Sequence, residues 1–156
     1  MASGEWRAKK RTMPANGQSK AKHYKELLVW QKGMVLARLV YRLTVRFPRE
    51  EKFGLTSQIR RAAVSVPSNI AEGQARQSTK EFLQFLSHAE GSLAELETQI
   101  LLSVELGFVW QEDVKEILAK IDELQKMLVG LKRKLEEVSP LGTRHSPLSS
   151  RAGYAR

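Results

Sequence analysis

Four arginines in the first half of the sequence follow one another at spacings of 4, 4 and 3 residues: Arg38, Arg42, Arg46 and Arg49. Residues four apart lie on one side of a helix, so the first three form a stripe, and Arg49 continues it just past the helix end. A guanidinium is a planar fork that matches the oxygens of a phosphate. The stripe therefore predicts contact with a polyanion such as a nucleic acid.

Three more arginines, Arg60, Arg61 and Arg76, lie on or just beyond the next predicted helix, and we include them in the predicted nucleic-acid site. Residues 23–76 hold ten basic and four acidic residues, a net charge of +6, whereas residues 77–138 hold seven and twelve, a net charge of −5. Three interpretations stay open: a solvated surface with ion pairs inside the chain, complementary contacts between copies of the chain, and phosphate binding.

The two ends of the chain carry most of its formal net charge of +9. Residues 1–22 hold six basic residues and one acidic residue, and residues 139–156 hold three arginines and no acid. Both segments lack an apolar face, so we predict disordered tails. The stretch WRAKKR at 6–11 suits single-stranded nucleic acid, with Trp6 stacking on a base, and a merely solubilising tail fits equally well. The tail residues that we add to the predicted site are Lys9, Lys10, Arg11, Lys20 and Lys22.

Residues suited to catalysis or metal binding do not cluster in the sequence. The three histidines, His23, His88 and His145, show no metal-ligand spacing. Glu95 and Glu97 are two apart on a predicted helix and point to different faces. No glycine-rich phosphate loop or nucleophile elbow is present. We therefore expect a non-enzymatic protein without a metal or cofactor.

The absence of cysteine excludes a disulfide framework and fits a reducing compartment. The longest apolar runs span only a few residues, too few for a transmembrane helix or the core of a signal peptide. We expect a cytoplasmic protein that does not enter a membrane.

Between the tails, four stretches show the apolar period of a helix. The first spans about 25–46, with Trp30, Met34, Ala37, Tyr41 and Thr44 on one side and Pro48 after its end. The second spans about 51–73. The third starts at the capping pattern Ser78-x-x-Glu81 and is stopped by Gly107. The fourth carries a heptad seam from Val114 to Val138.

Short connections force consecutive helices to lie side by side in opposite directions. We therefore predict an all-α, up-down-up-down antiparallel four-helix bundle over residues 23–138.

Four residues carry structural predictions. Pro67 lies inside the apolar pattern of the second helix, where we expect a kink; a helix that ends at Val66 and a new one that starts at Pro67 is the alternative. Asn69 is expected to be partly buried and to fix helix register or a subunit contact. Gly73 is expected to follow the second helix as a turn. Gly91, in mid-helix, is expected to mark a close helix crossing.

The sequence also resembles a known family. The motifs VWQK at 29–32, FGLTSQIRRAA at 53–63, PSNIAEG at 67–73 and GSLAELETQ at 91–99 are similar to those of the four-helix-bundle proteins encoded by intervening sequences in large-subunit ribosomal RNA genes. The resemblance covers residues 27–107 densely and neither tail.

The resemblance implies an up-down bundle that assembles as a ring-shaped homo-oligomer, a homopentamer, with a basic surface for RNA or other nucleic acid. It also implies a fold similar to the accessory protein of the reverse transcriptase in diversity-generating retroelements, which makes a protein-interaction scaffold the alternative function. It implies no catalytic residue.

Overall fold

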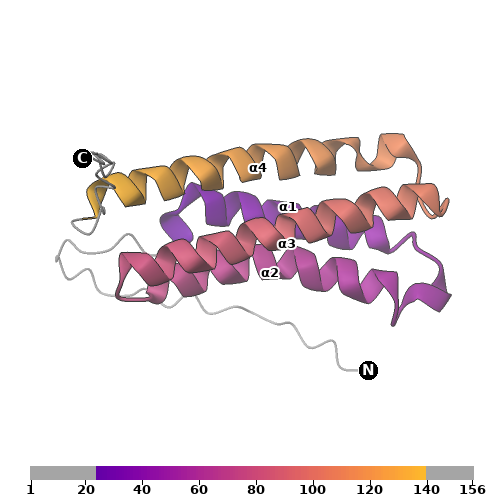
Figure 1. Ribbon diagram of the computed structural model, residues 1–156. Coiled ribbons are helices and arrows are strands. Elements are labelled where there is room, and N and C mark those ends of the chain that lie inside the picture. The colour runs from indigo at the N-terminus through magenta and orange to yellow at the C-terminus, as the bar shows by residue number, and fades with distance from the viewer. Residues whose placement is uncertain (1–23, 140–156) are drawn as a thin grey trace, which may run out of the picture.

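The structure is a computed structural model that describes residues 24–139. Within that range the chain forms four α-helices, two short 3-10 turns and no strand: η1 (Tyr24–Glu26), α1 (Leu28–Thr44), η2 (Arg49–Glu51), α2 (Leu55–Ala75), α3 (Thr79–Glu105) and α4 (Gln111–Val138). Consecutive helices run in opposite directions (Figure 1). The predicted tails lie outside the described residues, apart from Ser139.

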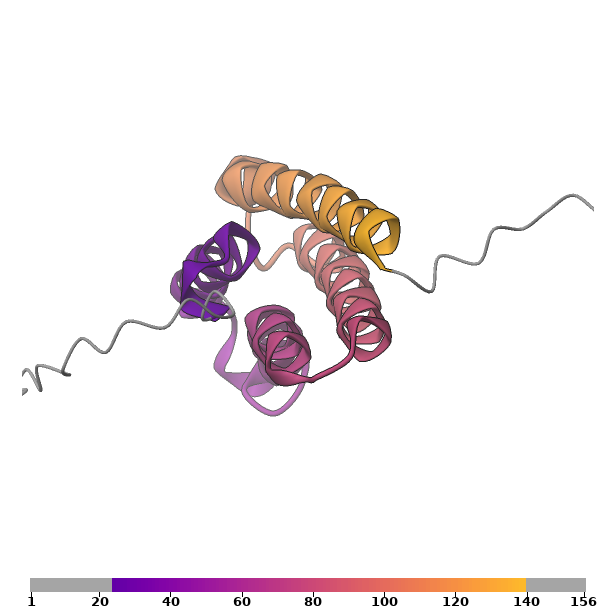
Figure 2. The same cartoon turned by 90° about the vertical axis from the view of Figure 1, so that its left-hand side faces the viewer.

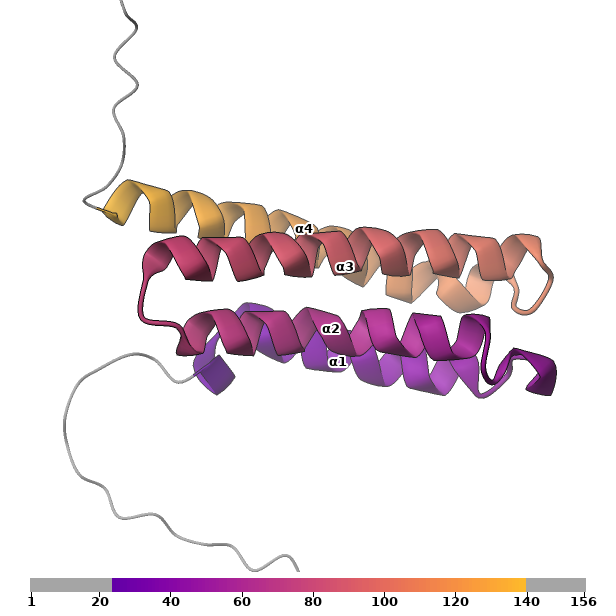
Figure 3. The same cartoon turned by 60° about the horizontal axis from the view of Figure 1, so that its bottom comes forward.

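The helices stand at the four corners of a square when the bundle is seen end-on (Figure 2). Each helix packs against two neighbours, so that α2 lies between α1 and α3 while α4 closes the ring between α3 and α1 (Figure 3). This is the antiparallel four-helix bundle that the short connections predict.

The core is built from the apolar faces that the period of 3.6 identifies in α2, α3 and α4. On α2 the fully buried side chains include Ile59, Val66 and Ile70. The heptad seam of α4 is buried from Val114 to Leu128, and Leu131 and Leu135 are partly buried. Val138 is exposed, so the seam prediction is wrong at its end, because the last turn of α4 lies beyond the buried core.

The predicted end signals of α3 are confirmed. The Ser78 hydroxyl accepts a hydrogen bond from the Glu81 backbone N–H at 3.1 Å and caps the first turn. At the other end Gly107 has φ +75°, and the N–H groups of Gly107 and Phe108 bond to the carbonyls of Val104 and Ser103. This Schellman motif needs a residue without a Cβ at its left-handed position.

The glycine predictions within the helices are both wrong. Gly73 does not follow α2 but lies buried inside it, where an added Cβ would be 2.7 Å from Phe85 Cβ and 2.9 Å from Phe82 Cδ2. Gly91 is exposed, and an added Cβ there would meet nothing within 4 Å. Of these two glycines Gly73 is the one that faces a neighbouring helix, so the close approach of α2 and α3 is at Gly73.

Pro67 lies inside one continuous helix, so the alternative of a break after Val66 is wrong. The kink itself stays a prediction. Pro67 is buried, and an added Cβ on Gly33 of α1 would lie 3.4 Å from Pro67 Cβ. A glycine on one helix thus lets the proline ring of the other approach closely.

Asn69 is partly buried, as predicted, but its amide nitrogen bonds to its own helix. This nitrogen donates to the Ser65 carbonyl at 2.8 Å and to Ser65 Oγ at 2.9 Å. Ser65 Oγ in turn hydrogen bonds to Ser92 Oγ of α3 at 2.8 Å. The polar link between α2 and α3 is therefore formed by Ser65 and Ser92, and Asn69 contributes a hydrogen bond to the Ser65 hydroxyl.

Candidate nucleic-acid interface

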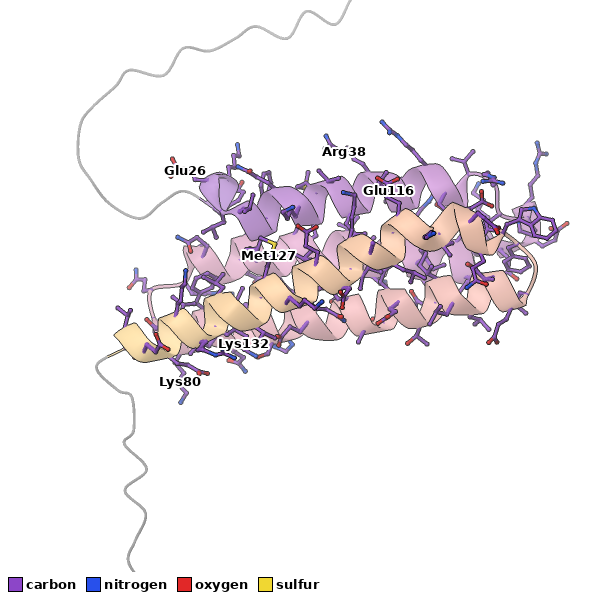
Figure 4. All side chains as sticks on the ribbon, turned by 90° about the horizontal axis from the view of Figure 1, so that it is seen from above. Glu26, Arg38, Lys80, Glu116, Met127 and Lys132 are labelled. Atoms are coloured by element: carbon purple, nitrogen blue, oxygen red, sulfur yellow. The ribbon has the colours of Figure 1, made fainter. Side chains whose placement is uncertain are left out.

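The predicted arginine stripe separates into two parts. Arg38 and Arg42 on α1 are exposed and form no ion pair or hydrogen bond with any residue in the range 24–139. The Arg38 side chain points outward from α1 (Figure 4). Arg46 instead pairs with Asp113 of α4, with 2.9 Å between Nη1 and Oδ1. The stripe therefore presents two unpaired guanidinium groups, and its third member already holds a carboxylate.

Arg46 departs from the stripe because α1 ends at Thr44. Beyond that residue the chain turns, and the Phe47 ring packs on Phe108 with 5.7 Å between their centroids. This packing joins the connection after α1 to the connection before α4. Arg46 consequently faces the first turn of α4 instead of continuing the helical stripe.

The Asp113 carboxylate accepts a hydrogen bond from Arg46 and another from the Trp110 backbone N–H at 2.9 Å. Both bonds favour the charged form, so Arg46 first and Trp110 second hold the pKa of Asp113 below its ordinary value. In the same way a hydrogen bond from Lys32 lowers the pKa of Glu123, at 2.7 Å between Nζ and Oε1. Two ion pairs thus tie basic α1 to acidic α4, as the intrachain interpretation of the charge split predicts.

The remaining predicted arginines also differ in their surroundings. Arg49 and Arg61 are exposed, and neither side chain has an ion pair or hydrogen bond among the described residues. Arg60 donates from Nε to Thr44 Oγ1 at 2.8 Å. Arg76 pairs with Glu72 at 2.9 Å and lies over the Phe85 ring. The lysines and arginine predicted for the N-terminal tail, Lys9, Lys10, Arg11, Lys20 and Lys22, lie outside the described residues.

A groove runs along the outer side of the bundle between α1 and α2. It consists of a hollow of about 600 Å³ beside η1 and a second hollow of about 470 Å³ toward the connection between the two helices. The two hollows share Tyr41 and Val64, and we call them together the α1–α2 groove. Its apolar lining is contributed mainly by Trp30, Met34, Tyr41, Val64, Pro67 and Phe53.

The charged residues of the groove are all cations. Its lining includes Arg38, Arg42, Lys52, Arg60 and Arg61, and none of the described residues that line it is an aspartate or a glutamate. The groove therefore combines an apolar floor with a basic rim. Arg38, Arg42, Arg60 and Arg61 are brought to one surface by the packing of α1 against α2. The other three predicted arginines, Arg46, Arg49 and Arg76, do not line the groove.

The sequence pattern did not identify this groove. Trp30, Met34 and Tyr41 share a side of α1 with Ala37 and Thr44, yet the buried face of α1 is made by Val29, Leu36, Val40 and Leu43 together with those two small residues. The buried face of α1 is thus centred on Leu36 and Val40, to one side of the predicted face. Trp30, Met34 and Tyr41 lie at its edge. The alternating 3-4 spacing of Val29, Gly33, Leu36, Val40 and Leu43 was the signal that identifies the core side.

Possible metal ligands do not gather in the described part of the chain. Among residues 24–139, no group of three or more His, Asp or Glu side chains is placed to hold a metal ion. Likewise, none of the described helices is long and apolar enough to cross a membrane.

The fold and the groove define the class of protein: an up-and-down helical bundle with a basic, partly apolar surface on its first hairpin. The family model described as 23S rRNA-intervening sequence protein matches residues 25–130, and the chain belongs to that family. The match includes every described residue of the α1–α2 groove except Tyr24.

A solved structure shares the fold. It is the crystal structure, at 1.70 Å resolution, of a protein with unknown function from the S23 ribosomal protein family of Bacteroides thetaiotaomicron. The two chains are 26% identical with a TM-score of 0.61, over 68% of this chain and 99% of the other. No curated protein matches the sequence.

Proposed function

We propose that this protein is a non-enzymatic nucleic-acid-binding bundle that contacts the phosphates of RNA through the basic rim of the α1–α2 groove. The observation that carries the proposal is the charge of this surface: among residues 24–139, five cations line the groove and no carboxylate does. Cations left without carboxylates are free to replace the counterions of a polyanion.

The residues assigned to phosphate contact are Arg38, Arg42 and Arg61, which line the groove, and Arg49, which lies outside its lining. All four are exposed and have no ion pair among the described residues. Arg46 and Arg76 are excluded from direct contact in this proposal, because each already holds a carboxylate at 2.9 Å. RNA is the first nucleic acid to test, since the description of the family refers to 23S rRNA.

The proposal includes assembly into a ring, a homopentamer, in the cytoplasm. The family resemblance supports this assembly, and the charge distribution is compatible with it. The α3–α4 hairpin carries twelve acidic residues against seven basic ones, and only three of those acids pair with cations of other helices within the described range, Glu90, Asp113 and Glu123. Unpaired carboxylates on this hairpin are available to a neighbouring copy.

The test compares two double variants that remove the same charge. Arg38→Ala/Arg42→Ala removes two unpaired cations of the groove. The control, Arg46→Ala/Lys126→Ala, removes two cations that are paired with Asp113 and Asp122 outside it. Fluorescence anisotropy with a labelled RNA over a salt series measures the affinity and its salt dependence.

The groove variant is expected to bind more weakly and to lower the slope of log K against log salt by about 0.7–0.9 for each phosphate that the protein no longer neutralises. The control is expected to keep most of the wild-type slope. Equal reductions of affinity in the two variants would show that only the total charge matters and would contradict the assigned site.

A second candidate function is a protein-interaction scaffold, for example an accessory subunit of a reverse transcriptase. Large apolar side chains at one end of the bundle favour it, since Phe53 is 90% exposed and Trp110 75% exposed. Under this function the purified protein binds RNA weakly and without preference. A purified reverse transcriptase would then form a complex that Phe53→Ser weakens.

A further inference from the structure

We infer that the α1–α2 groove accepts unpaired bases, so that the protein selects single-stranded over double-stranded nucleic acid. This inference rests on the proposed function. It gives the apolar floor of the groove a role in binding bases, which phosphate contact alone does not explain. The ligand class is a single strand whose phosphates follow the basic rim while one or more bases enter the groove.

Apolar side chains on the floor of the groove are exposed to solvent, which is unfavourable for apolar surface. Met34 is 39% exposed, Tyr41 44% and Val64 42%, and the three contribute to the same hollow beside the partly buried Trp30. Bases stack on aromatic side chains, and this stacking does not depend on sequence because every base has a π-face. A duplex keeps its base faces inside its own stack and has nothing to place on such a floor.

The size of the groove fits this ligand. Its two hollows, of about 600 and 470 Å³, each fall within the range of about 300–1,000 Å³ that is usual for sites of small organic molecules. Both hollows are lined by Tyr41 and Val64, so they adjoin along the two helices. A strand lying in the groove therefore passes Tyr41 whichever hollow its neighbouring bases occupy.

Tyr41 is held in place before any ligand binds. The guanidinium carbon of Arg60 lies 4.6 Å from the centroid of the Tyr41 ring, a cation–π distance. Arg60 is itself fixed by its hydrogen bond to Thr44 Oγ1, and that hydroxyl donates to the Val40 carbonyl at 2.9 Å. This chain of contacts limits the ordering that binding requires at the middle of the groove.

The basic rim distinguishes a nucleic-acid strand from an uncharged apolar ligand. Arg38 and Arg42 line the first hollow, and Lys52 and Arg61 line the second, so cations accompany the apolar floor along its length. The alternative ligand of the groove is an apolar segment from a second copy of the chain. The experiment below distinguishes this alternative from a nucleic-acid strand.

The experiment measures binding of three RNA ligands with equal numbers of phosphates: an unstructured single strand, the same backbone without bases, and a duplex. Three proteins are compared: wild type, Tyr41→Ala and the matched control Tyr41→Phe, which keeps the ring. Light scattering gives the oligomeric state of each protein, and thermal unfolding shows that each is folded.

We expect Tyr41→Ala to weaken binding of the single strand about 5- to 150-fold, the range that corresponds to removal of one base stack. Its binding of the abasic strand and the duplex should change less than about twofold. Tyr41→Phe should bind all three ligands like the wild type, since stacking needs the ring and not the hydroxyl.

A spectroscopic readout reports on the groove itself. In the variant Trp6→Phe/Trp110→Phe, Trp30 is the remaining tryptophan of the chain, and it lines the groove. The single strand should quench its fluorescence, whereas the abasic strand should not.

Equal loss of affinity for the three ligands, or no loss for any, would overturn the inference while leaving phosphate binding intact. A change of oligomeric state in Tyr41→Ala would also overturn it, because the groove would then be an interface between copies. Failure of the wild type to bind any ligand would overturn the proposed function together with the inference.

Discussion

The guanidinium of Arg46 lies 2.9 Å from the carboxylate of Asp113 and joins the end of α1 to the start of α4. The same carboxylate accepts the Trp110 backbone N–H, so one aspartate serves both a helix terminus and a contact between helices. An anion in the first turn of a helix is also favoured by the helix dipole. This pair explains why one member of the arginine stripe is unavailable to a ligand.

The lowered pKa of Asp113 predicts a dependence of stability on pH. The native pKa lies below the unfolded value of about 3.9, so the contribution of Asp113 to the free energy of unfolding is fully present above that value. It is lost as the pH falls through the native pKa. Asp113→Asn should therefore lose less stability on acidification than the wild type, as measured by urea unfolding at a series of pH values.

The control for that series is Glu105→Gln, which neutralises an exposed carboxylate without an ion pair among the described residues. It should follow the wild-type curve. Parallel curves for Asp113→Asn and wild type would show that the Arg46 contact does not stabilise the fold.

Two glycines predict opposite effects of the same substitution. Gly91→Ala should stabilise the protein by about 0.5–1 kcal/mol, because the new methyl group meets nothing within 4 Å and alanine favours the helix. Gly73→Ala should destabilise it by about 1–3 kcal/mol, because its Cβ would lie 2.7 Å from Phe85 Cβ. Urea unfolding at neutral pH measures both, and a Gly73→Ala variant more stable than wild type would contradict the close crossing.

The serine pair between α2 and α3 predicts a ranking of substitutions. Ser65→Ala removes the hydroxyl that bonds to both Ser92 and Asn69 and should cost about 1–3 kcal/mol, because Ser92 Oγ loses its partner on α2 while Asn69 keeps only its bond to the Ser65 carbonyl. Ser87→Ala, at an exposed position of α3, should stay within about 0.5 kcal/mol of wild type. Equal unfolding free energies for the two variants would show that the serine pair is not a structural link.

The N-terminal residues predict an effect on binding but not on assembly. Deleting residues 1–22 removes six basic residues and one acidic residue, so the salt dependence of RNA binding should become shallower. Light scattering should give the same oligomeric state as the full chain. A deletion that dissociates the oligomer would place these residues in an interface between copies.

Much of the architecture was predictable because it depends on local signals that repeat along the chain. The apolar period identified the buried faces of α2, α3 and α4, and Ser78 and Gly107 identified both ends of α3 through the backbone geometry that caps require. The ends of α2 were less predictable. Gly73 was predicted to follow α2 but lies inside it, because a glycine in a sequence can mark either a turn or a close approach of two helices.

The sequence predicted that the candidate site contains arginines, but not how they are arranged or what each one contacts. The spacing of Arg38 and Arg42 correctly places them on consecutive turns of α1, whereas Arg46 lies beyond the end of that helix. Spacing also says nothing of what faces each side chain across a gap between helices. Asp113 is 67 positions away along the chain from Arg46, and only the packing of the two connections brings it within 2.9 Å.

Periodicity, caps and short connections within the sequence were sufficient to specify an antiparallel bundle of four helices, because each acts over a few residues of the backbone. The packed structure alone determined which cations are held by a carboxylate and which stay open. It also determined that Met34, Tyr41 and Val64 meet as the floor of a groove. These outcomes depend on the rotation of each helix against its neighbours, which is set by how side chains from distant parts of the chain fit together in the core.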